Sequence, residues 1–160
     1  MNFVIRHPDP AELAELADLE RSADAKFVPL GIVFPSGTTM IEEAQDPSRV
    51  YVAGRPPIGF ALVSTVDGGV HLDQLAVHPV HEGKGTGTAL LEAVCALGDV
   101  TLTTFRDVPW NAPWYARRGF DILDPSEWGP ELTALVAHER DLGIEVAPRV
   151  VMRRLRSVGT

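Results

Sequence analysis

The stretch that decides this fold runs from Val70 to Leu91 and reads VHLDQLAVHPVHEGKGTGTALL. Its first half alternates apolar residues as a strand does, and its second half carries them at helical spacing. Between the two halves, Gly83, Gly85 and Gly87 allow a tight turn and a close approach of the backbone to a ligand. The sequence therefore predicts a strand over 70–77, a glycine-rich turn, and a helix with one apolar face, made by Leu90, Leu91, Val94 and Leu97.

The start of this helix is a candidate anion site. The first N–H groups of a helix have no partner within it, and together with the positive end of the helix dipole they attract phosphate or pyrophosphate. A P-loop needs Gly-x-x-x-x-Gly-Lys-Ser/Thr, and a dinucleotide fingerprint needs Gly-x-Gly-x-x-Gly. Here the glycines recur at every second position. Both motifs therefore fit weakly, and an ordinary glycine-rich loop stays open as an alternative.

Two blocks of sequence fit a third type of phosphate site. Leu75-Ala76-Val77-His78-Pro79, followed by Glu82-Gly83-Lys84-Gly85-Thr86-Gly87, resembles the acyl-CoA loop of the GNAT superfamily of N-acetyltransferases. Residues 111–120 are similar to a later motif of that superfamily, Asn-x-x-x-Tyr-x-x-x-Gly-Phe, on a short helix. One position departs from the pattern. Glu82 stands where Gln or Arg is usual, and its carboxylate is expected to repel a pyrophosphate mildly.

The resemblance implies an α/β (α+β) fold. It is a mixed, mostly antiparallel sheet flanked by helices, with splayed central parallel strands, in a single GNAT domain over residues 1–160. The pattern of the chain gives the order β-α-α-β-β-β-α-β-α-β-α-β, with one extra helix before the last strand. Strands are expected over 2–6, 49–53, 57–64, 70–77, 100–105, 120–123 and 148–155.

The remaining helices are predicted from apolar spacing and capping residues. The first follows Pro10, with Leu13, Leu16, Leu19, Ala23 and Phe27 as its apolar stripe and Glu12, Glu15, Asp18 and Glu20 as a solvated face. A short helix follows a capping box at Thr39 and Glu42. Asn111 and Gly119 are expected to cap the helix between them, and another helix is expected over 130–142.

Composition narrows the class of protein. The chain has 160 residues, 45% of them hydrophobic and 22% charged, which is typical of a globular domain. No stretch approaches the ~20 apolar residues of a membrane span, and the N-terminus lacks the regions of a signal peptide. Cys95 is the only cysteine, so a cytoplasmic location is expected. A net charge of −8 argues against nucleic acid as a partner and modestly favours a cationic substrate such as an amine.

The resemblance also implies acetyl-CoA (coenzyme A) as the cofactor. Backbone groups of Leu75 and Val77 would pair with the pantetheine arm as a further strand would. Asn111 would bond to that arm or order the splayed strands. The expected cofactor-binding residues are Leu75, Ala76, Val77, Glu82, Gly83, Lys84, Gly85, Thr86, Gly87, Thr88, Asn111, Trp114, Tyr115 and Arg118.

Acetyl transfer to an amine needs a proton acceptor, because an alkylammonium has a pKa near ~10.4. Residues 71–78 resemble the corresponding strand of arylalkylamine N-acetyltransferases, in which histidines at the positions of His71 and Asp73 accept protons through water. His71 and Asp73 are therefore candidate bases, and residues two apart on a strand share a face. The alternative is that Asp73 is solvated and His71 merely exposed. The resemblance makes Tyr115 the candidate acid for the departing thiolate, and a backbone N–H near Val77 the donor to the thioester carbonyl.

The acceptor is not identified by sequence. Phe27, Phe34 and Trp110 are candidates to line its pocket, with Arg106 and Asp107 near a polar end, although Phe27 equally fits the core. The expected acceptor is a small-molecule amine. A protein N-terminus or lysine is one alternative, and a non-catalytic acyl-CoA sensor is another. No metal site and no membrane contact are expected, since the five histidines show no ligand spacing. A homodimer is compatible with this interpretation.

Overall fold

The computed structural model describes residues 3–34, 37–143 and 147–156. They form a seven-stranded sheet in the order β1-β2-β3-β4-β5-β7-β6. The strands are β1 (Ile5–Arg6), β2 (Val50–Ala53), β3 (Gly59–Val66), β4 (Gly69–Val77), β5 (Val100–Phe105), β6 (Asp121–Ile122) and β7 (Arg149–Arg154). All neighbours pair antiparallel except β4 and β5, which pair parallel. The predicted mixed, mostly antiparallel sheet is confirmed.

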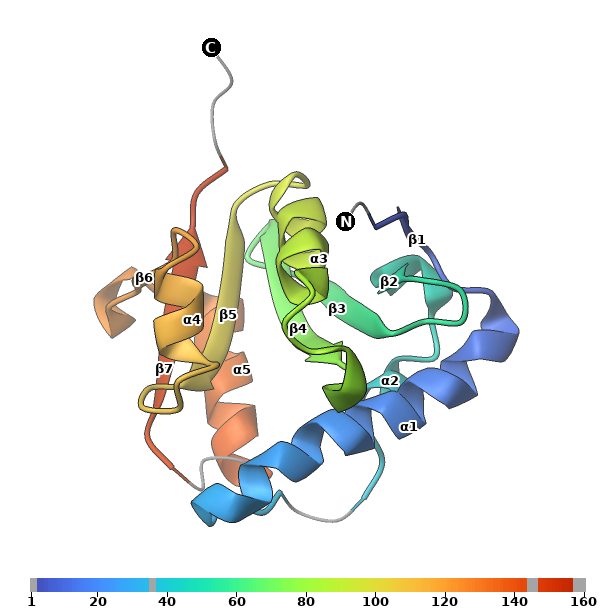
Figure 1. Ribbon diagram of the computed structural model, residues 1–160. Coiled ribbons are helices and arrows are strands. Elements are labelled where there is room, and N and C mark those ends of the chain that lie inside the picture. Colours follow the sequence, from blue (N-terminus) through green and yellow to red (C-terminus); the bar gives the residue numbers. More distant parts are fainter. Residues whose placement is uncertain (1–2, 35–36, 144–146, 157–160) are drawn as a thin grey trace.

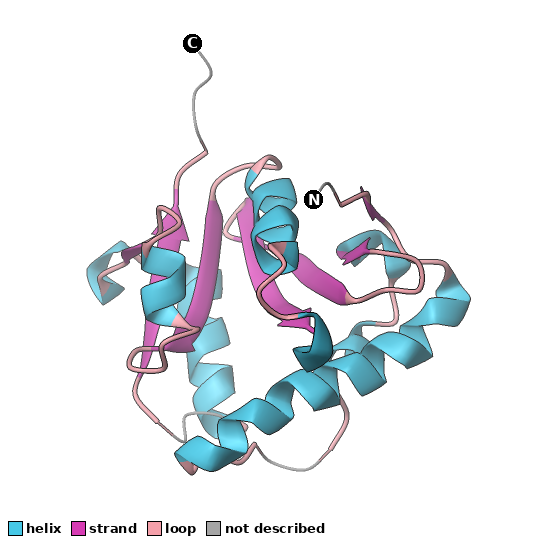
Figure 2. Ribbon diagram, viewed as in Figure 1, coloured by secondary structure: helices cyan, strands magenta, loops and turns pink. Residues whose placement is uncertain are grey.

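In the described part of the chain, five α-helices cover the two faces of this sheet. They are α1 (Leu13–Asp24), α2 (Met40–Ala44), α3 (Thr86–Cys95), α4 (Ala112–Ala116) and α5 (Pro130–Asp141). Helices α3 and α4 lie on one face, and α5 lies behind the sheet on the other, as Figures 1 and 2 show. The order of strands and helices along the chain is the predicted one. No helix in the described ranges is both long enough and apolar enough to span a membrane.

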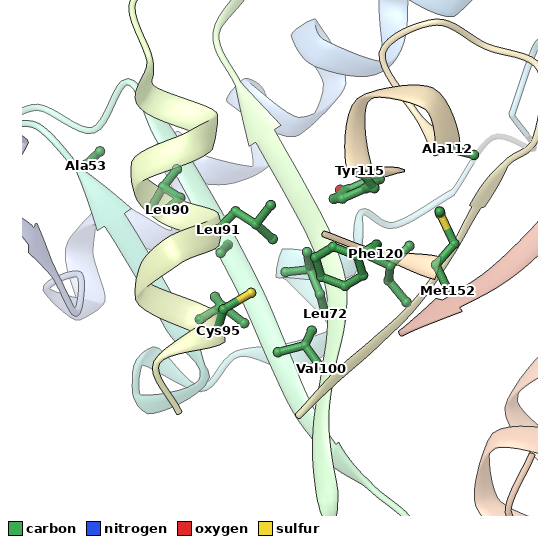
Figure 3. Packing of buried hydrophobic residues seen from close by; sticks show 13 residues of the cluster. Ala53, Leu72, Leu90, Leu91, Cys95, Val100, Ala112, Tyr115, Phe120 and Met152 are labelled. Atoms are coloured by element: carbon green, nitrogen blue, oxygen red, sulfur yellow. The ribbon is translucent and has the colours of Figure 1, made fainter. Parts of the chain in front are cut away.

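The core is divided by the sheet. On the α3 and α4 face, thirteen buried residues form the largest cluster, among them Leu72, Leu91 and Phe120 (Figure 3). On the opposite face, Leu16 and Leu19 of α1 pack with Phe60 and Ala76 of the sheet. Leu132 and Val136 of α5 pack with Val151 of β7. Alternate residues of each strand thus serve opposite faces, as a sheet covered on both sides requires.

Three sequence predictions, about the two edge strands and about α3, need correction. The first strand is shorter than 2–6: it covers Ile5–Arg6, and residue 2 lies outside the described part of the chain. The strand expected over 120–123 covers only Asp121–Ile122 at the sheet edge. Leu97 is 45% exposed rather than part of the buried helix face, because α3 ends at Cys95. The first two shortenings are at edge strands, where one side has no partner to hold the pairing.

Candidate functional site

The parallel pairing of β4 and β5 is short. The two strands pair at Val70↔Val100 and His71↔Thr101, whereas β4 runs on to Val77 and β5 to Phe105. The register of β3 against β4 shifts between Leu62 and Val63, which face Gln74 and Leu72, so Asp73 is an extra, bulged residue. A bulge bends its strand and increases the local twist. The two strands consequently diverge towards their C-terminal ends, a feature called the splay below (Figure 1).

The edge of β4 that faces β5 presents backbone N–H donors to the splay. The His78 N–H donates to the carbonyl of Ile58 on the β3 side. Because N–H directions alternate along a strand, the N–H groups of Val77 and Leu75 point towards β5. The Leu75 N–H donates to the Gln74 side-chain oxygen at 3.1 Å. A local side chain therefore occupies the Leu75 donor, and an incoming acceptor could replace it.

The loop after β4 has the backbone that its glycines predict. Gly83 and Gly85 have φ of +78° and +84°, and a Cβ at either position would meet nothing within 4 Å. Glycine is thus required there by backbone conformation and not by packing. Gly87 differs: a Cβ there would lie 3.5 Å from the Trp114 ring. Gly85 is the N-cap of α3 and offers no side-chain acceptor, so the first N–H groups of this helix stay available to a ligand.

Helix α4 lies against the start of α3. The Arg118 guanidinium stacks 3.9 Å above the Trp114 ring, and its Nε donates to the Thr88 hydroxyl at 3.0 Å. The Thr86 hydroxyl is buried and has no hydrogen-bond partner among the described residues. Trp114, Arg118 and Thr88, which the sequence assigned to one cofactor site, therefore lie together beside the glycine loop.

Asn111 stands at the predicted N-cap position of α4, but its side chain does not cap the helix. Instead its amide donates to the Thr104 hydroxyl on β5 at 2.7 Å, and its Oδ1 atom is buried without a partner. Asn111 therefore ties the start of α4 to β5 near the C-terminal end of that strand. The other predicted cap holds, since Gly119 follows the helix with φ of +89°.

Tyr115 is buried at the wall between α4 and the sheet. It is 8% exposed, and its ring packs edge-on against Trp114 at a centroid distance of 5.0 Å. It also packs against Phe120 at 5.5 Å (Figure 3). Burial, and after it the nearby Cys95 thiol, raises the pKa of the phenol. The hydroxyl therefore stays protonated across the neutral range and has a proton to donate.

The two candidate bases have different surroundings. His71 is 2% exposed, its Nδ1 lies 2.9 Å from the Thr101 hydroxyl, and burial lowers its pKa to about 4. The interpretation of His71 as an exposed residue is wrong. Asp73 is half-buried at the bulge, 3.5 Å from an Arg49 guanidinium nitrogen, and burial raises its pKa. His71 is thus neutral at pH 7, and the raised pKa makes Asp73 a stronger base than an exposed aspartate.

The aromatic residues assigned to the acceptor come together in one cluster. Phe27 lies 5.3 Å from Phe34 and 5.5 Å from both Phe105 and Trp110, between ring centroids. Phe27 is 8% exposed, so it belongs to a packed core. Arg106 and Asp107 form a two-bond ion pair with each other at 3.0 Å, exposed at the end of β5. In this structure the cluster is filled by its own side chains.

Two acidic residues of α1 were missed by the sequence analysis. Glu20 is 3% exposed and not solvated, because its carboxylate accepts the N–H groups of Met40 and Ile41 at the start of α2. Burial, and then the charge of Glu20, raises the pKa of Asp24 to about 6. Their position in the apolar stripe was the available signal, since Glu20 and Asp24 follow Leu16 at four-residue spacing.

A comparison with protein families supports the resemblance. Residues 46–122, which are 77 of the 160 residues, match the family model of the acetyltransferase (GNAT) domain. This part of the chain is therefore similar to a GNAT acetyltransferase domain. The matched range contains β2 to β6, the splay, the glycine loop and α4. Helices α1, α2 and α5 and strand β7 lie outside the matched range. Within the described ranges, no group of three or more His, Cys, Asp or Glu side chains is placed to hold a metal.

Three solved enzyme structures share this fold at low sequence identity. N-acetylglutamate synthase from Neisseria gonorrhoeae, complexed with coenzyme A and N-acetyl-glutamate, has a TM-score of 0.70 and 17% identity over 99% of this chain, which spans only 36% of that protein. PaiA N-acetyltransferase from Thermoplasma acidophilum, complexed with coenzyme A, has a TM-score of 0.62 and 16% identity over 97% of this chain and 99% of its own. The ribosomal-protein-S18-alanine N-acetyltransferase from Escherichia coli has a TM-score of 0.66 and 17% identity, over 99% of this chain and 97% of its own.

Proposed function

We propose that this GNAT domain transfers an acetyl group from acetyl-CoA directly to the primary amine of a small molecule, with both substrates bound together. The observation that carries the proposal is the splay. The parallel strands separate after His71 and Thr101, beside a glycine loop at a helix N-terminus and a buried tyrosine. A fold gains nothing in stability from leaving two central strands unpaired, whereas a ligand with its own polar backbone can fill the gap.

The cofactor would be held along β4 and at the start of α3. The N–H groups of Leu75 and Val77 on the inner edge of β4 suit the amides of a pantetheine arm. The free N–H groups that follow Gly85 suit a pyrophosphate, because they combine unpaired donors with the positive end of a helix dipole. Neisserial N-acetylglutamate synthase and PaiA, which share the fold, are both complexed with coenzyme A.

In the proposed reaction the amine first loses a proton, and Asp73 is the proposed acceptor, through water. The nitrogen lone pair then attacks the thioester carbonyl carbon while the Val77 N–H stabilises the developing oxyanion. The carbon–sulfur bond breaks, and the thiolate takes a proton from the Tyr115 hydroxyl, which regains one from the new amide nitrogen through solvent. His71 is neutral and buried against Thr101, so it would act by ordering this end of the splay.

The small amine is favoured over a peptide by the acceptor side of the site. Asp24 ends α1 on this side, and Asp73 adds a second carboxyl group from β4. Two carboxyl groups suit a cationic amine, in line with the net charge of −8.

A protein N-terminus remains the second candidate acceptor. The Escherichia coli neighbour is an alanine N-acetyltransferase of ribosomal protein S18. A sensor without activity is less favoured, because cofactor binding alone needs neither the protonated Tyr115 hydroxyl nor Asp73.

The test is a panel of acceptors incubated with acetyl-CoA, in which release of free thiol is measured. The panel contains aliphatic and aromatic primary amines, lysine, and peptides with free N-termini. Thiol release with a small amine, abolished or strongly reduced in Tyr115→Phe, supports the proposal. Release with peptides alone would select the second candidate. Binding of acetyl-CoA without release on any acceptor would favour the sensor.

A further inference from the structure

One lysine connects the two sides of the splay. Lys26 belongs to the 3-10 helix Ala25–Leu30 (η2), which continues α1. Its Nζ lies 2.9 Å from a carboxylate oxygen of Glu82, the residue that opens the glycine loop after β4. The same Nζ lies 4.7 Å from the ring centroid of Trp110, in the connection between β5 and α4. A single ammonium group thus contacts the β4 side and the β5 side.

The path of α1 brings this lysine to the open end of the splay. Leu16 and Leu19 of α1 pack with Ala76 near the end of β4. Further along the chain, Phe27 packs against Phe105, the last residue of β5. Lys26 therefore follows a helix that crosses from one strand end to the other, as Figure 1 shows for α1.

The two contacts of Lys26 add little to the stability of the folded protein. The two side chains of its ion pair are 32% and 44% exposed. Exposed ion pairs and exposed cation–π contacts stabilise a protein little, because water screens them and the long side chains lose freedom. Such a lysine can be shared with a stronger anion at small cost. A diphosphate is a stronger anion, and Lys binds phosphates as a flexible point charge.

The charges of the loop indicate what Lys26 adds to the site. Within the loop, Glu82 carries one negative charge and Lys84 one positive charge, and the Lys84 ammonium lies 2.9 Å from His81 Nδ1. The loop alone is therefore neutral. The resemblance has Gln or Arg where Glu82 stands. Lys26 restores the positive charge that an arginine would bring, but from a different helix.

We propose that Lys26 is a cofactor-binding residue that contacts the diphosphate of coenzyme A, and that Glu82 is a positioning residue that holds Lys26 at the loop. This deepens the proposed function and rests on it. Glu82, whose carboxylate alone would repel a diphosphate, then acts together with Lys26. The two residues replace the Gln or Arg that the resemblance has at position 82.

The test measures affinity by titration calorimetry for two probes, coenzyme A and S-acetylpantetheine, which lacks the diphosphate. Lys26→Met should weaken coenzyme A binding by about tenfold or more, as the loss of one charge-assisted contact predicts. It should leave S-acetylpantetheine binding within about twofold. The matched control is Arg156→Met, which removes the same charge beyond the end of β7, from an exposed residue. This control should leave both affinities unchanged.

Glu82→Gln tests the positioning role through its dependence on Lys26. In the wild-type background it should change coenzyme A affinity by less than about threefold, because repulsion and positioning are lost together. In the Lys26→Met background it should improve affinity, because only the repulsion is left to remove. Additive effects of the two changes would contradict the positioning role.

The outcomes separate this inference from the proposed function. Equal coenzyme A affinity in wild type and Lys26→Met would overturn the role of Lys26 and leave the cofactor site standing. Equal losses for both probes would show that Lys26 acts on the fold and not on the diphosphate. A wild-type protein that binds neither probe would overturn the proposed function, and the inference with it.

Discussion

The Nδ1 atom of His71 lies 2.9 Å from the Thr101 hydroxyl, on the last rung at which β4 and β5 pair. Beyond this rung the strands separate, so the His71–Thr101 contact marks the closed end of the splay. Because burial lowers the pKa of His71 to about 4, the imidazole stays neutral there at physiological pH.

The burial of the His71 side chain predicts that the stability of the protein depends on pH. The folded-state pKa of His71 is depressed below the ordinary histidine value of 6.5, so the unfolded chain binds the extra proton first as pH falls. The His71 contribution is therefore fully present above about pH 6.5 and is lost towards pH 4, by roughly 3 kcal/mol for a shift of this size. Urea unfolding of wild type and His71→Gln at pH 7 and pH 4.5 checks this. The difference in free energy of unfolding should shrink at the lower pH, and a constant difference would contradict it.

Asp24 predicts the opposite trend in the same window. Its folded-state pKa is raised to about 6, so the folded chain holds the proton more tightly and stability falls as pH rises from about 4 to 6. Asp24→Asn should therefore be more stable than wild type at pH 7, by about 1 kcal/mol once screening of this partly exposed group is allowed for. The advantage should disappear near pH 4. Glu15→Gln, at an exposed position on the same helix, is the control and should show no such trend.

Tyr115→Phe isolates the hydroxyl of the proposed acid. The ring and its contacts with Trp114 and Phe120 remain, so acetyl-CoA affinity should stay within a small factor. General acid assistance contributes roughly 10²–10⁴ in rate, so turnover should fall at least about tenfold where chemistry is rate-limiting. Steady-state kinetics with the best acceptor of the panel measures this. Full activity under rate-limiting chemistry would remove Tyr115 from the mechanism.

Helix α5, the extra helix before the last strand, is held at its start by two residues that each accept the other's backbone N–H. The Asp67 carboxylate in the β3–β4 turn accepts the N–H groups of Glu131 and Leu132 at 2.9 and 3.0 Å, and the Glu131 carboxylate accepts the Asp67 N–H. Asp67→Gly, which suits the positive φ of 51° at this position, should lower the free energy of unfolding by about 1–2 kcal/mol. Acetyl-CoA affinity should not change. A matched loss of affinity would mean that α5 contributes to the cofactor site.

The sequence predicted those parts of the site that depend on local backbone. Gly83 and Gly85 adopt the left-handed conformation that glycine favours, and Thr39 and Glu42 form the expected capping box. The order of elements followed from apolar periodicity. Each of these features is decided within a few residues of the chain, and for that reason sequence patterns report them.

What the sequence could not predict depends on contacts between distant residues. Asn111 bonds to Thr104 instead of capping α4, because β5 lies within reach of its amide. Glu20 is buried because the start of α2 supplies two N–H partners. The pairing of Lys26 with Glu82 joins residues 56 positions apart. The spacing of Glu20 from Leu16 signals that Glu20 is buried, but no local pattern encodes the partner in any of these three contacts.

The central claim, that the loop after β4 and the splay bind acetyl-CoA, is tested most directly by thermal unfolding with and without this ligand. Ligand that binds only the folded state raises the melting temperature. Gly85→Val forces a β-branched residue to φ near +84°, and the control Gly68→Val imposes the same strain at φ +77° in the distant β3–β4 turn. Acetyl-CoA should raise the melting temperature of wild type and Gly68→Val, more than free adenine nucleotides do, and should fail to raise that of Gly85→Val. An undiminished shift in Gly85→Val, or no shift in the wild type, would contradict the account.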